Sequence, residues 1–96
     1  MDINKALRTA ISSGEVRIGL RETKKALASE KARLVIVSSN LPADELRDLK
    51  TAKKASFFTF KGNNMELGFA CGKPFSIGVL AVIKPGESDI LALKEE

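Results

Sequence analysis

The chain has 96 residues and 44% of them are hydrophobic, which suits a single domain over residues 1–96. Its net charge of +4 makes a polyanionic partner such as a nucleic acid plausible. One cysteine and no histidine exclude an internal disulfide, cysteine-rich metal sites and a Ser-His-Asp arrangement, so we expect no enzyme, no metal and no cofactor.

The first part of the chain is predicted to form a helix, a strand and a second helix. Asp2 can cap the first helix and Gly14 can end it, since apolar residues between them recur at helical spacing: Ile3, Ala6, Leu7, Ala10 and Ile11. The alternation over Glu15–Ile18 indicates a short strand. Gly19 then turns the chain into a helix over residues 20–29.

The middle of the chain is predicted to hold a buried strand, a third helix and an aromatic strand. The continuous β-branched run Leu34–Val37 suits a strand that is buried on both faces of a sheet. Pro42 fits the first turn of the third helix, which carries Leu46, Leu49 and Ala52 inward and has Lys53 and Lys54 near its end. The third strand contains Phe57, Phe58 and Phe60.

Residues 62–73, GNNMELGFACGK, are predicted to join a polar loop to a short capped helix. Asn63 can cap the helix while Glu66 reaches back to the cap, and Gly72 can end it in a left-handed conformation. The free N–H groups at the start of such a helix suit an anion or a polar nucleic-acid edge. Cys71 is better interpreted as a small buried thiol than as a nucleophile, because the sequence contains no histidine to activate it.

The last part is predicted to contain a long apolar strand over residues 76–83, a turn at Pro85 and Gly86, a short strand over residues 90–93 and a frayed tail over residues 94–96. Strands that alternate with helices predict an α/β fold, a three-layer α/β/α sandwich around a small mixed sheet of four to five strands. No apolar run is long enough to cross a bilayer and no leader precedes a cleavage site, so we expect a cytoplasmic protein without a membrane partner.

Three segments carry a resemblance that spans nearly the whole chain. They are GNNMELGFACGK at residues 62–73, KPGESDIL at residues 84–91 and, more weakly, VIVSSN at residues 35–40. Together they resemble the archaeal and eukaryotic large-subunit ribosomal protein L30e family, which lies within the wider L7Ae superfamily of kink-turn-binding proteins. The resemblance implies a three-layer fold whose loops, gathered at one end of the sheet, clamp a kink-turn-type internal loop of rRNA.

The resemblance also implies which residues contact RNA. In the superfamily a polar residue, a glutamate and, three positions later, a lysine read tandem sheared G·A pairs, and Arg21, Glu22 and Lys25 occupy those positions here. The other implied contacts are Gly19, Asn40, Asn64, Phe75 and Gly78. The implied partners are rRNA and neighbouring components of the large subunit, with the protein a monomer off the ribosome.

The chemistry of these side chains suits folded RNA. Proteins read RNA sequence mainly in loops and bulges, because the A-form major groove is too narrow for side chains. Arg21 offers a planar fork of donors, and Glu22 can accept from base N–H groups. Phe75 can cover an unstacked base, a contact worth ~1–3 kcal/mol.

Each of these residues also has a purely structural interpretation. Arg21, Glu22 and Lys25 could form a solvated first turn with an i,i+3 ion pair, and Asn40 could shape a turn. Asn63 and Asn64 could both be capping residues, and Phe75 could belong to the core. Gly19 and Gly78 could serve backbone geometry alone.

Ribosomal RNA binding is therefore one of several functional hypotheses. A stand-alone kink-turn protein of a guide-RNA particle, or one that regulates an mRNA, belongs to the same superfamily. A nucleotide-binding domain that uses residues 62–64 as a phosphate loop is a different class, although neither a GxxxxGK[ST] nor a GxGxxG pattern is present. A protein-interaction module would need an exposed apolar stripe, and the sequence suggests none.

Overall fold

The sheet is built around a strand that is apolar throughout. Leu34–Val37 (β2) reads LVIV, and each of its residues is at most 1% exposed. β2 pairs in parallel with Ser56–Thr59 (β3) and antiparallel with Val79–Lys84 (β4), and β4 pairs antiparallel with Glu15–Ile18 (β1). The sheet is therefore mixed, with the strand order β1-β4-β2-β3.

This computed structural model describes residues 1–51 and 55–93. The expected inward position of Ala52, the placement of Lys53 and Lys54 at a helix end and the tail over residues 94–96 lie outside the described residues. Within the described part, no helix is long and apolar enough to span a bilayer.

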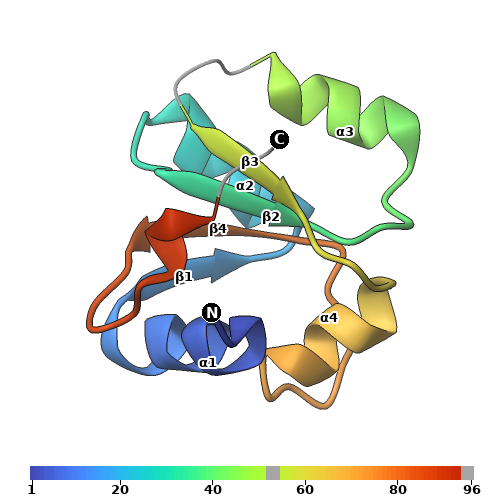
Figure 1. The fold of residues 1–96 in the computed structure, drawn as a ribbon. Coiled ribbons are helices and arrows are strands. Elements are labelled where there is room, and N and C mark those ends of the chain that lie inside the picture. The colour runs from blue at the N-terminus through green and yellow to red at the C-terminus, as the bar shows by residue number, and fades with distance from the viewer. Residues whose placement is uncertain (52–54, 94–96) are drawn as a thin grey trace.

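Helices cover both faces of the sheet. They are Ile3–Ser13 (α1), Leu20–Ala28 (α2), Ala43–Lys50 (α3) and Asn64–Ala70 (α4). Alternate residues of a strand point to opposite faces, so Leu34 and Ile36 of β2 join the core of α1 and α4, while Val35 and Val37 join the core of α2 and α3. Figure 1 shows the sheet between these two helix layers. The expected three-layer α/β/α fold is confirmed.

The predicted caps of α1 and α4 are also confirmed, whereas Pro42 is the N-cap of α3 and not part of its first turn, since the helix begins at Ala43. The Asp2 carboxylate accepts a 3.1 Å hydrogen bond from the Lys5 N–H at the start of α1. At α4, the Asn63 side chain accepts from the Glu66 N–H at 2.9 Å and the Glu66 carboxylate accepts from the Asn63 N–H at 3.0 Å. Gly72, with φ of 75°, follows the helix in the left-handed region. These reciprocal bonds satisfy backbone donors that the first turn of a helix leaves free.

Two strand predictions differ from the structure. β4 begins at Val79 rather than at residue 76, because the Ile77 N–H donates to the Asn64 carbonyl and so ties this segment to α4. Residues 90–93 do not form a strand, since Ile90–Ala92 is a 3-10 helix. The Ser88 hydroxyl accepts from the Ile90 N–H and donates to the Ala6 carbonyl of α1, which holds this segment in the core and away from the sheet edge.

Gly68 lets the loop before β4 lie directly on α4. A Cβ atom at Gly68 would overlap the Phe75 carbonyl oxygen. Glycine in a helix interior costs about 1 kcal/mol relative to alanine, so close packing explains its presence here. The contact holds residues 73–78 against α4 and thereby positions Phe75.

We expect Gly68→Ala to lower the free energy of unfolding by about 1–3 kcal/mol, because the clash with the Phe75 carbonyl outweighs the gain in helix propensity. Urea denaturation measures this difference. Gly78→Ala is the matched control, since its Cβ would lie 3.5 Å from the Leu41 side chain, an ordinary contact. Equal stability of the two variants would contradict the close packing.

Candidate nucleic-acid interface

The loops at one end of the sheet are joined to one another by backbone hydrogen bonds. The N–H groups of Gly19, Ser38, Ser39 and Ile77 donate to the carbonyls of Val79, Gly78, Gly62 and Asn64, respectively, at 2.8 to 2.9 Å. We call residues 19–22, 38–40, 62–64 and 75–78 the rim. It lies at the right-hand side of Figure 1, where β3 leads to α4. Segments far apart in the sequence thus form one continuous surface.

Asn40 and Asn64 lock the centre of the rim together. The Asn40 Oδ1 accepts from the Asn64 backbone N–H at 2.9 Å and from the Ser38 hydroxyl at 2.9 Å. The Asn40 Nδ2 donates to the Asn64 Oδ1 at 3.1 Å. Since an amide oxygen has two lone pairs and an amide nitrogen two hydrogens, Asn40 has one N–H left for a ligand. The pair therefore presents mainly donors to whatever binds the rim.

The structure separates the two asparagines of the α4 cap. Asn63 is the capping residue, as predicted, whereas Asn64 bonds to Asn40 instead of capping the helix. The backbone N–H groups of Asn64 and Glu66 are both satisfied by asparagine side chains. The expectation that free N–H groups here would hold an anion is therefore not supported at these two positions.

The first turns of α2 carry the three residues expected to read base pairs. Arg21 is exposed and Glu22 half-buried, and the Glu22 carboxylate lies 3.6 Å from the Lys25 ammonium. The i,i+3 ion pair that the sequence suggested is thus present. An exposed pair of this kind contributes little to stability, so it leaves both charges available to a ligand.

The remaining expected residues lie on the rim. Phe75 is 53% exposed, so its side chain is not part of the core. Gly19 has φ of 101°, a conformation that favours glycine, and a Cβ there would meet no atom within 4 Å. The Gly78 carbonyl accepts from the Ser38 N–H, so this glycine joins β4 to the loop after β2.

Sequence reasoning missed Ser38 as part of the site. Its side chain is 2% exposed, and its hydroxyl donates to the same Asn40 oxygen that holds Asn64. The signal was its position directly after β2, where a buried hydroxyl needs a partner.

Cys71 is a structural residue rather than a nucleophile. It is 4% exposed at the end of α4. Burial raises the pKa of its thiol from 9.0 to about 11, although the positive charges of Lys73 and Arg8 oppose the shift. The thiol is therefore protonated at neutral pH. In the part of the chain that the structure describes, no group of three or more His, Cys, Asp or Glu side chains could hold a metal.

Comparisons with known proteins identify ribosomal proteins as the relatives of this chain. The model of the ribosomal protein L7Ae/L30e/S12e/Gadd45 family matches residues 1–92. Large ribosomal subunit protein eL30 of Methanoregula boonei is 43% identical over 94 residues, covering 98% of this chain and 97% of that protein. The eL30 protein of Pyrobaculum calidifontis is 44% identical over 98 residues, covering 99% and 97%. The eL30B protein of Schizosaccharomyces pombe is 43% identical over 93 residues, covering 94% and 80%.

We expect Asn40→Ala and Asn64→Ala to lower the free energy of unfolding non-additively. Either change removes the side-chain bond between them, so a double-mutant cycle in urea should give a coupling energy of about 1 kcal/mol. Ser39→Ala is the control, because Ser39 takes part in the rim through its backbone N–H. Strictly additive effects would mean that the two amides do not hold the rim together.

The raised pKa of Cys71 predicts a pH-dependent contribution to stability. The folded state holds the thiol proton more tightly than the unfolded state, so the contribution is complete below pH 9.0 and is lost as the pH rises towards about 11. The free energy of unfolding of the wild type, measured relative to Cys71→Ala, should therefore fall across this interval. A difference that stays constant with pH would be inconsistent with a buried thiol.

Proposed function

Since the chain belongs to the ribosomal protein L7Ae/L30e/S12e/Gadd45 family, we propose that it is a structural constituent of the large ribosomal subunit whose rim binds a kink-turn-type internal loop of rRNA. Relatives that match nearly its whole length are named as large-subunit proteins, which supports the ribosomal part of the proposal. The family is structural and non-enzymatic, so this chain is not an enzyme.

One observation carries the RNA-binding part of the proposal. The bond network between Asn40 and Asn64 fixes two amide side chains from different loops in one orientation. Amide donors held in this way suit the exposed base edges of an RNA loop and the 2′-hydroxyl groups that distinguish RNA from DNA. A rigid scaffold that presents loops is also where binding residues are usually found.

The other expected contact residues, on the rim and in the next turn of α2, have complementary roles in this proposal. Arg21 and Glu22 read the sheared G·A pairs, since the guanidinium donates to guanine acceptors and the carboxylate accepts base N–H groups. Lys25 contacts a phosphate or a guanine edge, and Phe75 covers an unstacked base. Gly19 and Gly78 allow the RNA to approach the backbone closely.

The proposed location, partners and oligomeric state follow from the same family membership. The protein works in the cytoplasm as part of the ribosome, beside other large-subunit components, and is a monomer when free. The net charge of +4 adds a non-specific attraction to RNA that weakens as salt rises. Specificity therefore has to be measured at constant ionic strength, where this attraction is the same for every RNA.

We expect Glu22→Gln to weaken binding to a kink-turn RNA by about tenfold, because an amide nitrogen replaces one acceptor oxygen at the G·A pairs. A gel-shift titration at fixed salt measures the dissociation constant. A matched RNA whose G·A pairs are replaced by Watson–Crick pairs should bind more weakly to the wild type, and Glu22→Gln should not weaken its binding further.

Asp44→Asn, which removes an exposed carboxylate from the first turn of α3, is the charge-matched control. If only the net charge mattered, Asp44→Asn and Glu22→Gln would have the same affinity for the kinked RNA and the same affinity for the paired RNA. The proposal requires instead that Asp44→Asn keeps the preference for the kinked RNA. Equal, steeply salt-dependent binding of the wild type to both RNAs would contradict specific readout.

A further inference from the structure

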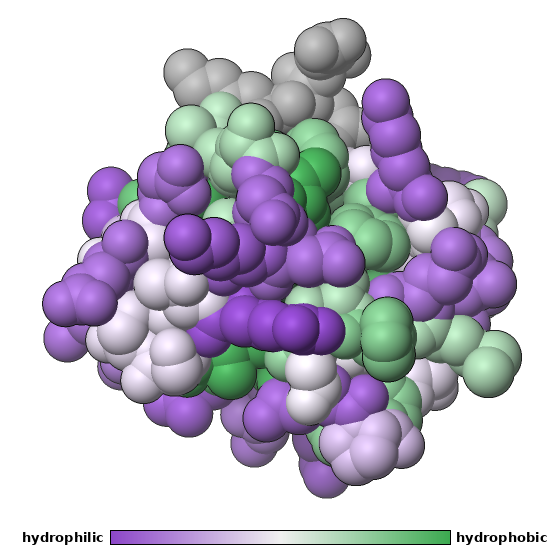
Figure 2. Space-filling view, turned by 60° about the horizontal axis from the view of Figure 1, so that its bottom comes forward, coloured by the Kyte–Doolittle hydropathy of each residue, from purple (hydrophilic) through white to green (hydrophobic). Residues whose placement is uncertain are grey.

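Two large apolar side chains stand out from α4. Met65 is 72% exposed and Phe69 is 73% exposed, and their i,i+4 spacing places them on one side of the helix. Figure 2, which brings the α1 and α4 face of the molecule forward, shows hydrophobic surface there that is interrupted by long hydrophilic side chains. An exposed apolar patch surrounded by polar side chains is typical of a binding surface.

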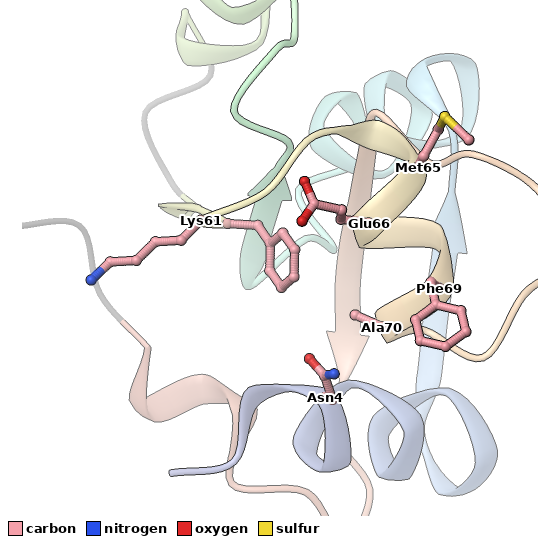
Figure 3. Close-up of a pocket in the computed structure, with 7 residues that line it drawn as sticks. Asn4, Lys61, Met65, Glu66, Phe69 and Ala70 are labelled. Carbon is pink, nitrogen blue, oxygen red and sulfur yellow. The ribbon is translucent and has the colours of Figure 1, made fainter.

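A pocket of about 350 Å³ adjoins these side chains, between α1 and α4. Phe60 and Phe69 contribute aromatic rings to its lining, and Asn4, Glu66 and Lys61 contribute polar groups. Figure 3 shows Asn4 pointing from α1 toward α4, where Glu66 and Phe69 lie, while the Lys61 side chain extends away from them. The pocket thus combines aromatic surface with a few polar groups.

This combination matches the chemistry of a nucleobase. A base has two apolar faces that stack on aromatic rings and an edge that carries both donors and acceptors. Asn4 offers an amide donor and acceptor to such an edge. The Glu66 Oε1 already accepts from the Asn63 N–H at 3.0 Å, which fixes the carboxylate and leaves its other oxygen as an acceptor.

Two cations and one carboxylate, that of Glu66, lie at or beside the pocket. The Arg8 guanidinium donates to the carbonyls of Phe69 and Ala70, each at 3.1 Å, and so holds a positive charge beside the C-terminal end of α4. The Lys61 ammonium adds a second cation on the other side. Each RNA nucleotide carries a phosphate as well as a base, so the cations would contact the phosphate and the aromatic rings the base.

The pocket and the rim share α4, since Asn64 at the start of this helix belongs to the rim and Met65 and Phe69 line the pocket. Met65 directly follows Asn64, and Phe69 comes five residues after Asn64, which at the rise of an α-helix is about 8 Å along its axis. We propose that the pocket receives the base of an unpaired nucleotide that neighbours the RNA loop bound at the rim. This inference rests on the proposed function, because the same RNA occupies both places.

Removing single bases from the RNA tests the inference. Each unpaired nucleotide of a kink-turn RNA, and of a single-stranded extension at either strand end, is replaced in turn by an abasic nucleotide. For the wild-type protein one replacement should weaken binding by at least about fivefold. For Phe69→Leu the same replacement should have a much smaller effect, because one of the two aromatic rings of the pocket is gone.

Phe75→Leu is the matched control, since it makes the same truncation at the other exposed phenylalanine and should not remove the effect of that replacement. A methyl-labelled sample gives a second readout, because the chain has two methionines and the Met65 signal can be assigned from Met65→Leu. Ring current from the bound base should shift the Met65 methyl signal with the intact RNA and less with the abasic one.

The outcomes separate this inference from the function on which it rests. If the wild type does not prefer kink-turn RNA, both are wrong. If it does, and no abasic replacement is coupled to Phe69, only the pocket inference is overturned. The pocket inference is also overturned if the Phe69→Leu variant no longer assembles into large subunits while all its RNA affinities are unchanged. That result would assign this face of α4 to a protein contact.

Discussion

The burial of β2 on both faces is the constraint on which the rest of the structure depends. Four consecutive apolar residues that are at most 1% exposed cannot face water on either side, so each face of the sheet needs its own helix layer. α1 with α4 and α2 with α3 meet this need. Connecting the strands to helices on both sides brings several loops to the same end of the sheet, and these loops form the rim.

The rim is held by its own hydrogen bonds before any ligand binds. The side-chain oxygens of Asn40 and Asn64 accept bonds from within the rim, which holds the loops together and leaves side-chain N–H groups for a ligand. Such preorganisation lowers the entropy cost of binding. It also links stability with recognition, because Asn40 and Asn64 serve both. A variant at either position therefore has to be measured for folding as well as for RNA affinity.

Local signals predicted much of the fold, and the errors have physical reasons. The Asn63–Glu66 capping box, the left-handed Gly72 and the buried β2 are confirmed, because each depends on residues close in sequence. The expected strand over residues 90–93 is wrong, because the Ser88 bond to Ala6 of α1 joins distant parts of the chain. The same limit applies to the site: the sequence suggested Asn40 and Asn64 separately, but their direct bond and the exposure of Phe69 are visible only in the fold.

The central claim is that separate loops act as one RNA-binding surface. Amide chemical-shift mapping of the labelled protein, titrated with a kink-turn RNA, tests it directly. We predict that the backbone signals of Gly19 and Gly78 and the side-chain amide signals of Asn40 and Asn64 change together, at one stoichiometry. Changes confined to scattered lysine and arginine residues, with these four residues unaffected, would mean that the RNA binds through charge alone and would contradict the account.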